Sequence, residues 1–182
     1  MVSIIKNKNT NHIKWREGSY PSLENTQKLD NFPFFIPTTF IDLLKIHDGG
    51  DIEYDFNYFD VDCNSTMQGC IGTIYGINTI NSKIPNKNFD HLSTDYYNQK
   101  EFFTTYNNLI DAYYHPPEFF PKNIVPFARD GGGNFVCFDY RSNPKTNNPP
   151  IVYWNHEADI GKDVSFIAKN FDEFISMLKE SD

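Results

Sequence analysis

The sequence lacks the features of several large protein classes. It has no run of about 18 apolar residues, the length that a helix needs to span a bilayer. Its first ten residues, MVSIIKNKNT, contain no apolar stretch of signal-peptide length. Its three cysteines, Cys63, Cys70 and Cys137, are an odd number and their spacing matches no zinc motif. We therefore expect a cytoplasmic protein that does not bind a membrane and has no disulfide framework.

Positive charge is missing from a long central stretch. No Lys or Arg occurs between Ile46 and Ser82, and this stretch alone carries six negative charges in a chain of net charge −8. The six residues are Asp48, Asp51, Glu53, Asp55, Asp60 and Asp62. Binding to a phosphate backbone relies on clustered Lys and Arg. The composition thus argues against a nucleic acid partner and favours a basic protein.

The aromatic content predicts a folded chain. Hydrophobic residues make up 39% of the 182 residues, with 17 Phe and 11 Tyr, more apolar surface than a disordered chain leaves in water. The length fits one domain. We expect residues 1–35 to form an N-terminal arm with a short helix, Ser22–Leu29, packed on the domain, and residues 36–182 to form the domain itself.

Three segments show the apolar period of an amphipathic helix. They are Ile36–Gly50, Gln99–Tyr114 and Asn170–Glu180. Gly49 is placed to end the first helix in a left-handed conformation. Asn170 and Glu173 form a pair like a capping box at the start of the third.

Six segments read as strands. Ile52–Tyr58 alternates strictly between apolar and polar residues, which predicts a half-buried strand with its carboxylates facing water. The others are Gly69–Ile77, Ile124–Ala128, Asn134–Tyr140, Ile151–Trp154 and Val164–Ala168. Short connections between successive strands predict an antiparallel meander. The fold class is therefore α+β, with a single mainly antiparallel sheet flanked by helices.

The triple glycine Gly131–Gly133 raises the question of a phosphate-binding loop. Such a loop precedes a helix whose amides bind the phosphate, or is followed by a Lys. Here the strand NFVCF follows instead. We interpret the glycines as a turn between two core strands.

No motif indicates catalysis or metal binding. None of the five histidines lies in an H-x-x-x-H frame, and no G-x-S-x-G elbow occurs. The acidic stretch lacks the Gly and Glu positions of a calcium loop. We therefore expect no catalytic residues, no metal and no cofactor.

The acidic stretch allows two interpretations. It is either a solvated face of the sheet or a surface complementary to a basic protein, where charge speeds association. Under the second interpretation, the candidate partner-binding residues are Asp51, Glu53, Asp55, Asp60 and Asp62.

Three blocks of the sequence resemble the SUKH superfamily. They are the helix of Ile36–Gly50 with its ending HDGG, the segment IVPFARDGGGNFVCFD, and IVYWNHE followed by IAKNFDEFISML. The superfamily includes fungal cell-wall-assembly regulators of the Smi/Knr type and many bacterial immunity proteins. Its usual Asn-Gly-Gly is Asp48-Gly49-Gly50 here, and Asp also suits a helix-exit turn. The resemblance implies an α+β domain without known catalytic residues and with a protein-binding role.

Three functions follow as hypotheses. The first is an immunity protein that binds and neutralises a cognate toxin, possibly a nuclease, whose surface is basic because its substrate is polyanionic. The second is an intracellular regulatory scaffold like the fungal branch of the family. The third is a small-ligand binder or enzyme with a pocket near Trp154 and His156.

Overall fold

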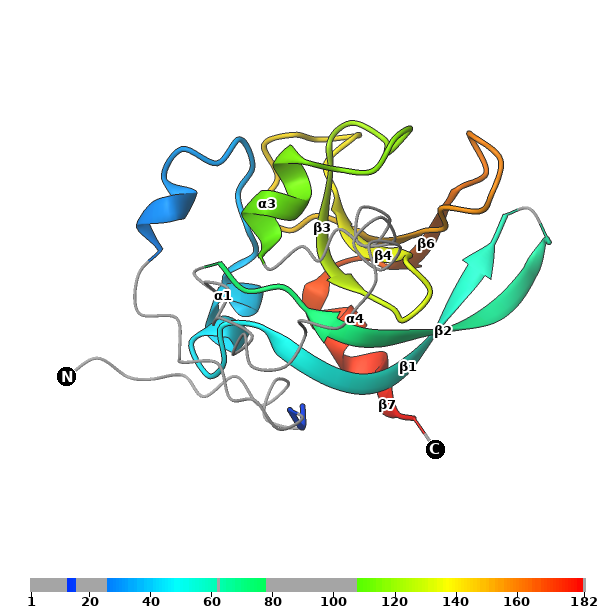
Figure 1. The fold of residues 1–182 in the computed structure, drawn as a ribbon, viewed down its shortest axis with the longest axis horizontal. Coiled ribbons are helices and arrows are strands. Elements are labelled where there is room, and N and C mark those ends of the chain that lie inside the picture. Colours follow the sequence, from blue (N-terminus) through cyan, green and yellow to red (C-terminus); the bar gives the residue numbers. More distant parts are fainter. Residues whose placement is uncertain (1–12, 16–25, 62, 78–107, 182) are drawn as a thin grey trace, which may run out of the picture.

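One antiparallel sheet of seven strands, in the order β6-β5-β4-β3-β2-β1-β7, forms the centre of the structure (Figure 1). The structure is a computed structural model and describes residues 13–15, 26–61, 63–77 and 108–181. The strands are β1 Gly50–Asp60, β2 Ser65–Ile74, β3 Ile124–Arg129, β4 Phe135–Asp139, β5 Ile151–Trp154, β6 Val164–Ala168 and β7 Lys179–Glu180. The helices are η1 Gln27–Leu29, α1 Thr38–Leu44, α3 Leu109–Tyr114 and α4 Phe171–Met177. The predicted α+β class with a flanked antiparallel sheet is confirmed.

The central strands are buried on both faces. On one face, rings from two helices and two strands contact one another at centroid distances of 4.3 to 6.3 Å. They belong to Phe40 of α1, Phe171 and Phe174 of α4, Phe127 of β3 and Phe138 of β4. On the other face, Phe135 stacks on Trp154, and Phe120 packs edge-on against both. Because both faces are covered, β3, β4 and β5 read as continuous apolar runs.

The meander of β3, β4 and β5 is antiparallel, as predicted. Cys137 is fully buried in β4, where it acts as a small core residue, whereas Cys63 and Cys70 are exposed.

Strand β1 shows the predicted alternation. Its buried positions are Ile52, Tyr54, Phe56 and Tyr58, and the residues between them face outward. Gly69 of β2 lies opposite Phe56, and a Cβ at this glycine would come within 2.6 Å of the Phe56 ring. The absence of a side chain at Gly69 thus allows the Phe56 ring to pack closely on β2.

The first helix is shorter than predicted. It ends at Leu44, and Gly49 lies beyond it. Gly49 does have a left-handed conformation, with φ +85°, but it serves the entry into β1: a Cβ there would lie 2.3 Å from the Gly76 backbone nitrogen. The helix ends early because the chain must turn before this close contact.

The second helix starts later than predicted. Asn108 is extended, with φ −154°, and its side chain accepts a hydrogen bond from the Asp111 backbone amide as an N-cap. A continuous helix through Gln99–Tyr114 is therefore wrong at Asn108; residues 99–107 lie outside the described part of the chain.

The last helix begins as the sequence predicts. The Asn170 side chain accepts a hydrogen bond from the Glu173 amide at 2.9 Å, and the Glu173 carboxylate accepts one from the Lys169 amide at 2.6 Å. Two amides at the helix start are thus satisfied by side chains.

Parts of the predicted N-terminal arm pack on the sheet. The Lys14 amide donates to the Tyr54 hydroxyl at 3.0 Å, and the Lys14 ammonium lies 2.6 Å from a Glu180 carboxylate oxygen. The predicted short helix is described only as η1, since residues 16–25 lie outside the described residues. A domain boundary at residues 35 and 36 stays a prediction.

The triple glycine forms the turn between β3 and β4. Asp130 organises it: one carboxylate oxygen accepts hydrogen bonds from the Gly132 amide at 2.7 Å and the Asn134 amide at 2.9 Å. Gly133 alone of the three glycines has positive φ, +98°. A strand follows, so the turn interpretation is confirmed.

This geometry predicts different costs for two glycine substitutions. Gly133→Ala should destabilise the protein by about 1–2 kcal/mol, because its φ is unfavourable for a residue with a Cβ. Gly131→Ala, where a Cβ meets nothing within 4 Å, should stay within about 0.5 kcal/mol of wild type. Urea unfolding measures both; equal losses would contradict the assignment of the strain to Gly133.

Candidate functional site

Three of the predicted partner-binding residues lie close together along one strand. Asp51, Glu53 and Asp55 are exposed or half-buried positions near the start of β1, and a bulge in the pairing with β2 falls between Asp51 and Tyr54. Successive residues of a strand are roughly 3.3 Å apart, so the three positions span about 13 Å of the strand. We call these three residues the acidic row.

Uncharged side chains donate hydrogen bonds to two carboxylates of the acidic row. The Asp51 carboxylate accepts a hydrogen bond from the Thr73 hydroxyl at 2.9 Å. The Asp55 carboxylate accepts bonds of 2.7 Å from the Gln68 amide group and from the Ser181 hydroxyl. These donors orient the carboxylates without neutralising them. Lys179 is the residue opposite Asp55 on β7, so one positive charge borders the row.

The remaining acidic residues have other positions. Asp60 lies at the end of β1, where its carboxylate accepts a hydrogen bond from the Cys63 amide at 2.8 Å and holds the turn. Asp62 lies outside the described residues. Asp48 does not belong to the solvated face: it is buried and accepts a 2.6 Å hydrogen bond from the Ile77 amide. Its role is to join the end of the α1 region to the end of β2.

The described parts of the chain leave much of the β1–β2 hairpin exposed. Alternate residues of β1 are exposed, and most of β2 before Gly69 is exposed as well. By contrast, every residue of β4 and β5 is buried. The β1–β2 hairpin therefore offers exposed side chains that the central strands do not.

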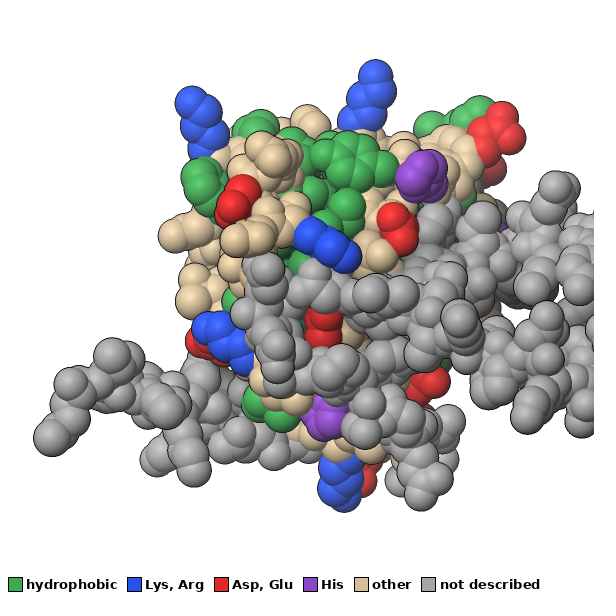
Figure 2. Space-filling view, turned by 60° about the vertical axis from the view of Figure 1, so that its left-hand side comes forward, with side chains coloured by type: hydrophobic (Ala, Val, Ile, Leu, Met, Phe, Trp, Pro, Cys, Tyr) green, Lys and Arg blue, Asp and Glu red, His purple; other side chains and the backbone are tan. Residues whose placement is uncertain are grey.

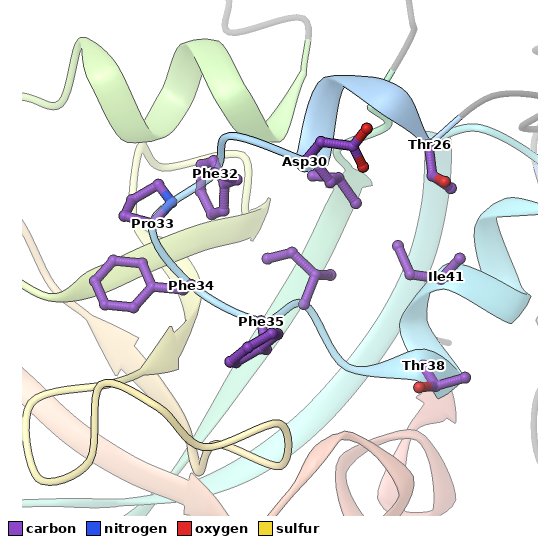
Figure 3. Close-up of a pocket in the computed structure, with 10 residues that line it drawn as sticks. Thr26, Asp30, Phe32, Pro33, Phe34, Phe35, Thr38 and Ile41 are labelled. Carbon is purple, nitrogen blue, oxygen red and sulfur yellow. The ribbon is translucent and has the colours of Figure 1, made fainter.

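A groove that the sequence analysis missed lies between η1 and α1. It encloses about 450 Å³ and is lined by Thr26, Leu29, Asp30, Phe32, Pro33, Phe34, Phe35, Ile36, Thr38 and Ile41 (Figure 3). Figure 2 shows hydrophobic side chains gathered on the side of the molecule where η1 and α1 lie. The lining segment has no helical or strand period, so no pattern in the sequence predicted a cavity there.

The chemistry of this groove is simple. Its walls are mostly apolar, and Asp30 is the one charged residue among those that line it. Neighbouring Phe32 and Phe34 are fixed by edge contacts with Tyr113, and Phe34 also stacks on Tyr140. The lining holds no pair of titratable groups for acid–base catalysis.

The predicted ligand residues Trp154 and His156 have structural roles. Trp154 is buried, and its indole N–H donates to the Asp163 carboxylate at 2.9 Å. The His156 amide and its Nδ1 both contact the Asn134 side-chain oxygen, at 3.1 and 2.8 Å. Trp154 is thus a core residue, and His156 fastens the loop after β5 to the glycine turn.

Asp130 connects that turn to the core. Its second carboxylate oxygen accepts hydrogen bonds from the Tyr153 hydroxyl at 2.6 Å and from the Asn134 side-chain amide at 2.8 Å. Burial, and next the hydrogen bond to Asp130, raise the pKa of Tyr153 well above its ordinary value, since both disfavour tyrosinate. This network is satisfied internally and leaves no free catalytic group.

Two further features are absent from the described residues. No helix among them has the length and apolar character needed to cross a membrane. Within the same residues, no three His, Cys, Asp or Glu side chains are grouped in a way that suits a metal ion.

Comparison with known protein families shows to which family the chain belongs. The profile described as SMI1 / KNR4 family (SUKH-1) matches residues 27–177. The chain belongs to this family. The match confirms the resemblance to the SUKH superfamily drawn from the three sequence blocks.

One curated relative of this SUKH-1 chain comes from a bacterium. It is the SPbeta prophage-derived uncharacterized protein YokK of Bacillus subtilis (strain 168), 27% identical over 175 residues, which cover 88% of this chain and 78% of that protein. No solved structure matches the chain.

The Tyr153 network predicts a loss of stability at high pH. The unfolded chain releases this proton near the ordinary pKa of 10.0, whereas the folded chain keeps it, so raising the pH above about 10 favours unfolding. The contribution is about 1.4 kcal/mol per pH unit between the two pKa values.

Tyr153→Phe removes this titration and tests the sign. Near neutral pH the variant should lose about 0.5–1.5 kcal/mol with the hydrogen bond to Asp130. Between about pH 8 and about pH 11, its urea midpoint should fall less steeply than that of wild type. Parallel pH profiles would contradict a raised pKa at Tyr153.

Proposed function

We propose that this protein is a non-enzymatic immunity protein, which binds a cognate toxin domain in the cytoplasm and blocks it by occupying its surface. Membership of the SUKH-1 family supports a protein-binding role. The observation that carries the proposal is the acidic row on β1, in a hairpin that the described parts of the chain leave largely exposed.

Charge complementarity supports a basic partner. Three carboxylates close together on one strand create a negative potential that attracts a positively charged protein and speeds association. A nuclease toxin has such a surface, because it must bind a polyanion. Covering that basic surface would exclude the nucleic acid without any chemical step.

The roles of the buried acids support the absence of catalysis in this proposal. Asp130 holds the glycine turn, Asp163 accepts from Trp154, and Asp139 binds the Arg141 guanidinium through two hydrogen bonds of 2.9 and 2.8 Å. Each carboxylate is committed to the fold, which leaves recognition to the exposed acids.

The relative favours the bacterial role over the regulatory scaffold of the fungal branch. That protein is described as prophage-derived and comes from a bacterium. Mobile elements are a setting in which a protein that protects its carrier from a toxin is retained. The scaffold function stays the alternative hypothesis.

Co-expression tests the proposed function. The toxin-like product of the adjacent gene should arrest growth of a bacterial host when expressed alone. Co-expression of this chain should restore growth, and the two proteins should co-purify in a ratio of about one to one. A host that is not protected, together with no complex in solution, would overturn the proposal.

Charge reversal tests the acidic row. Glu53→Lys should slow association with that partner by about fivefold at low salt and flatten the dependence of the rate on salt. Glu157→Lys, the same charge change at an exposed position in the loop after β5, is the matched control and should keep wild-type kinetics. Equal effects of both variants would show that only net charge matters.

A further inference from the structure

The outer half of the β1–β2 hairpin extends from the body of the protein. Phe56–Asp60 and Ser65–Gly69 pair in the sheet only with each other, because β2 pairs with β3 at Thr73 and Ile74 alone. On its other side, β1 pairs with β7 only at Tyr54 and Asp55. Figure 1 shows this arm reaching past β3 and β4.

The base of the arm packs on the core, whereas the apolar side chains near its end are exposed. On the inner face, the Phe56 ring lies 5.8 Å from Phe174, and the Tyr58 ring lies 4.8 Å from Tyr153. Beyond Tyr58 the apolar side chains are exposed: Phe59 by 48%, Val61 by 56% and Met67 by 40%. We call these three residues the hairpin tip.

The hairpin tip presents apolar groups on both sides of the arm. Phe59 follows the acidic row on the outward face and pairs with Thr66, whereas Met67 pairs with Tyr58 on the inner face. Three of the nine large exposed hydrophobic residues in the described part of the chain gather in this short stretch. Exposed apolar side chains that gather at one place are a feature of interaction surfaces.

Two of the three residues of the hairpin tip lie in paired strands. Phe59 pairs with Thr66, and Met67 pairs with Tyr58. Near them, the Cys63 amide donates to the Asp60 carboxylate at 2.8 Å. A side chain on a backbone that is fixed by strand pairing loses less conformational entropy on binding than one on a flexible segment.

We propose that the hairpin tip is the apolar anchor of the complex, inserted into an apolar recess of the same basic partner whose charges the acidic row attracts. This inference rests on the proposed function and adds the place and chemistry of the contact. Apolar anchors surrounded by polar rims account for most of the binding energy at protein interfaces.

The negative charge beside the hairpin tip indicates which kind of molecule binds there. A second copy of this chain would bring another acidic row toward the first, and like charges in an interface are unfavourable. A basic protein has complementary charge at the same place. The occupant is therefore a basic partner protein.

Dissociation kinetics test the anchor, with the purified product of the adjacent gene as the probe. Phe59→Ala should raise the dissociation rate by about tenfold or more and change the association rate by less than about twofold. Phe166→Ala is the matched control: this ring is 50% exposed on edge strand β6, and its loss should leave both rates unchanged.

A second variant distinguishes a loss of binding from a loss of folding stability. Val61 lies in the turn outside the strand pairs, so Val61→Ser should raise the dissociation rate while keeping the wild-type unfolding midpoint. If both tip variants dissociate at the wild-type rate while Glu53→Lys still slows association, the anchor is overturned and the proposed function stands.

Two further outcomes would also overturn the anchor. Failure of the wild-type chain to bind the adjacent-gene product would overturn both the anchor and the proposed function. A free protein that sediments as a dimer, and as a monomer after Phe59→Ala, would show that the tip joins two copies of this chain, which overturns the anchor.

Discussion

Aromatic rings from α1, α4, β3 and β4 interlock on one face of the central strands, while Phe120, Phe135 and Trp154 cover the other face. Because β4 and β5 are buried throughout, their side chains have no access to a partner. The sheet surface that the described chain leaves open lies on the β1–β2 hairpin. Within the described sheet, the exposed side chains therefore lie mainly on that hairpin.

The same difference in burial decides what could be predicted from the sequence. Strand β1 is buried on one face only, so its alternation revealed both the strand and its outward carboxylates. Strands β4 and β5 are buried on both faces, so their apolar runs revealed strands without showing which residues share a face. Asp48 looked like one more solvated acid, because its burial depends on the Ile77 amide, 29 residues away. Such long-range contacts leave no local pattern.

The hairpin tip shows a signal that sequence analysis could have used. The outward positions of β1 are Asp51, Glu53, Asp55, Asn57 and Phe59, so the alternation itself places one large ring among polar side chains. A single exposed ring is common in proteins, but this ring has exposed Val61 and Met67 near it, and such a group of apolar side chains is less common. That the ring stands at the free end of the arm, beyond the last internal ring contact, followed only from the register of the strands.

The acidic row adds little cost to folding and retains its charge for a partner. Two unit charges about 7 Å apart in water repel by about 0.6 kcal/mol, so each neighbouring pair in the row opposes folding only weakly. Thr73, Gln68 and Ser181 offset part of this cost through hydrogen bonds. Since these donors are neutral, they fix the carboxylates in place without cancelling their charge. Under the proposed function, a positively charged partner would meet carboxylates that are already oriented, which favours fast and selective association over a gain in the stability of the free protein.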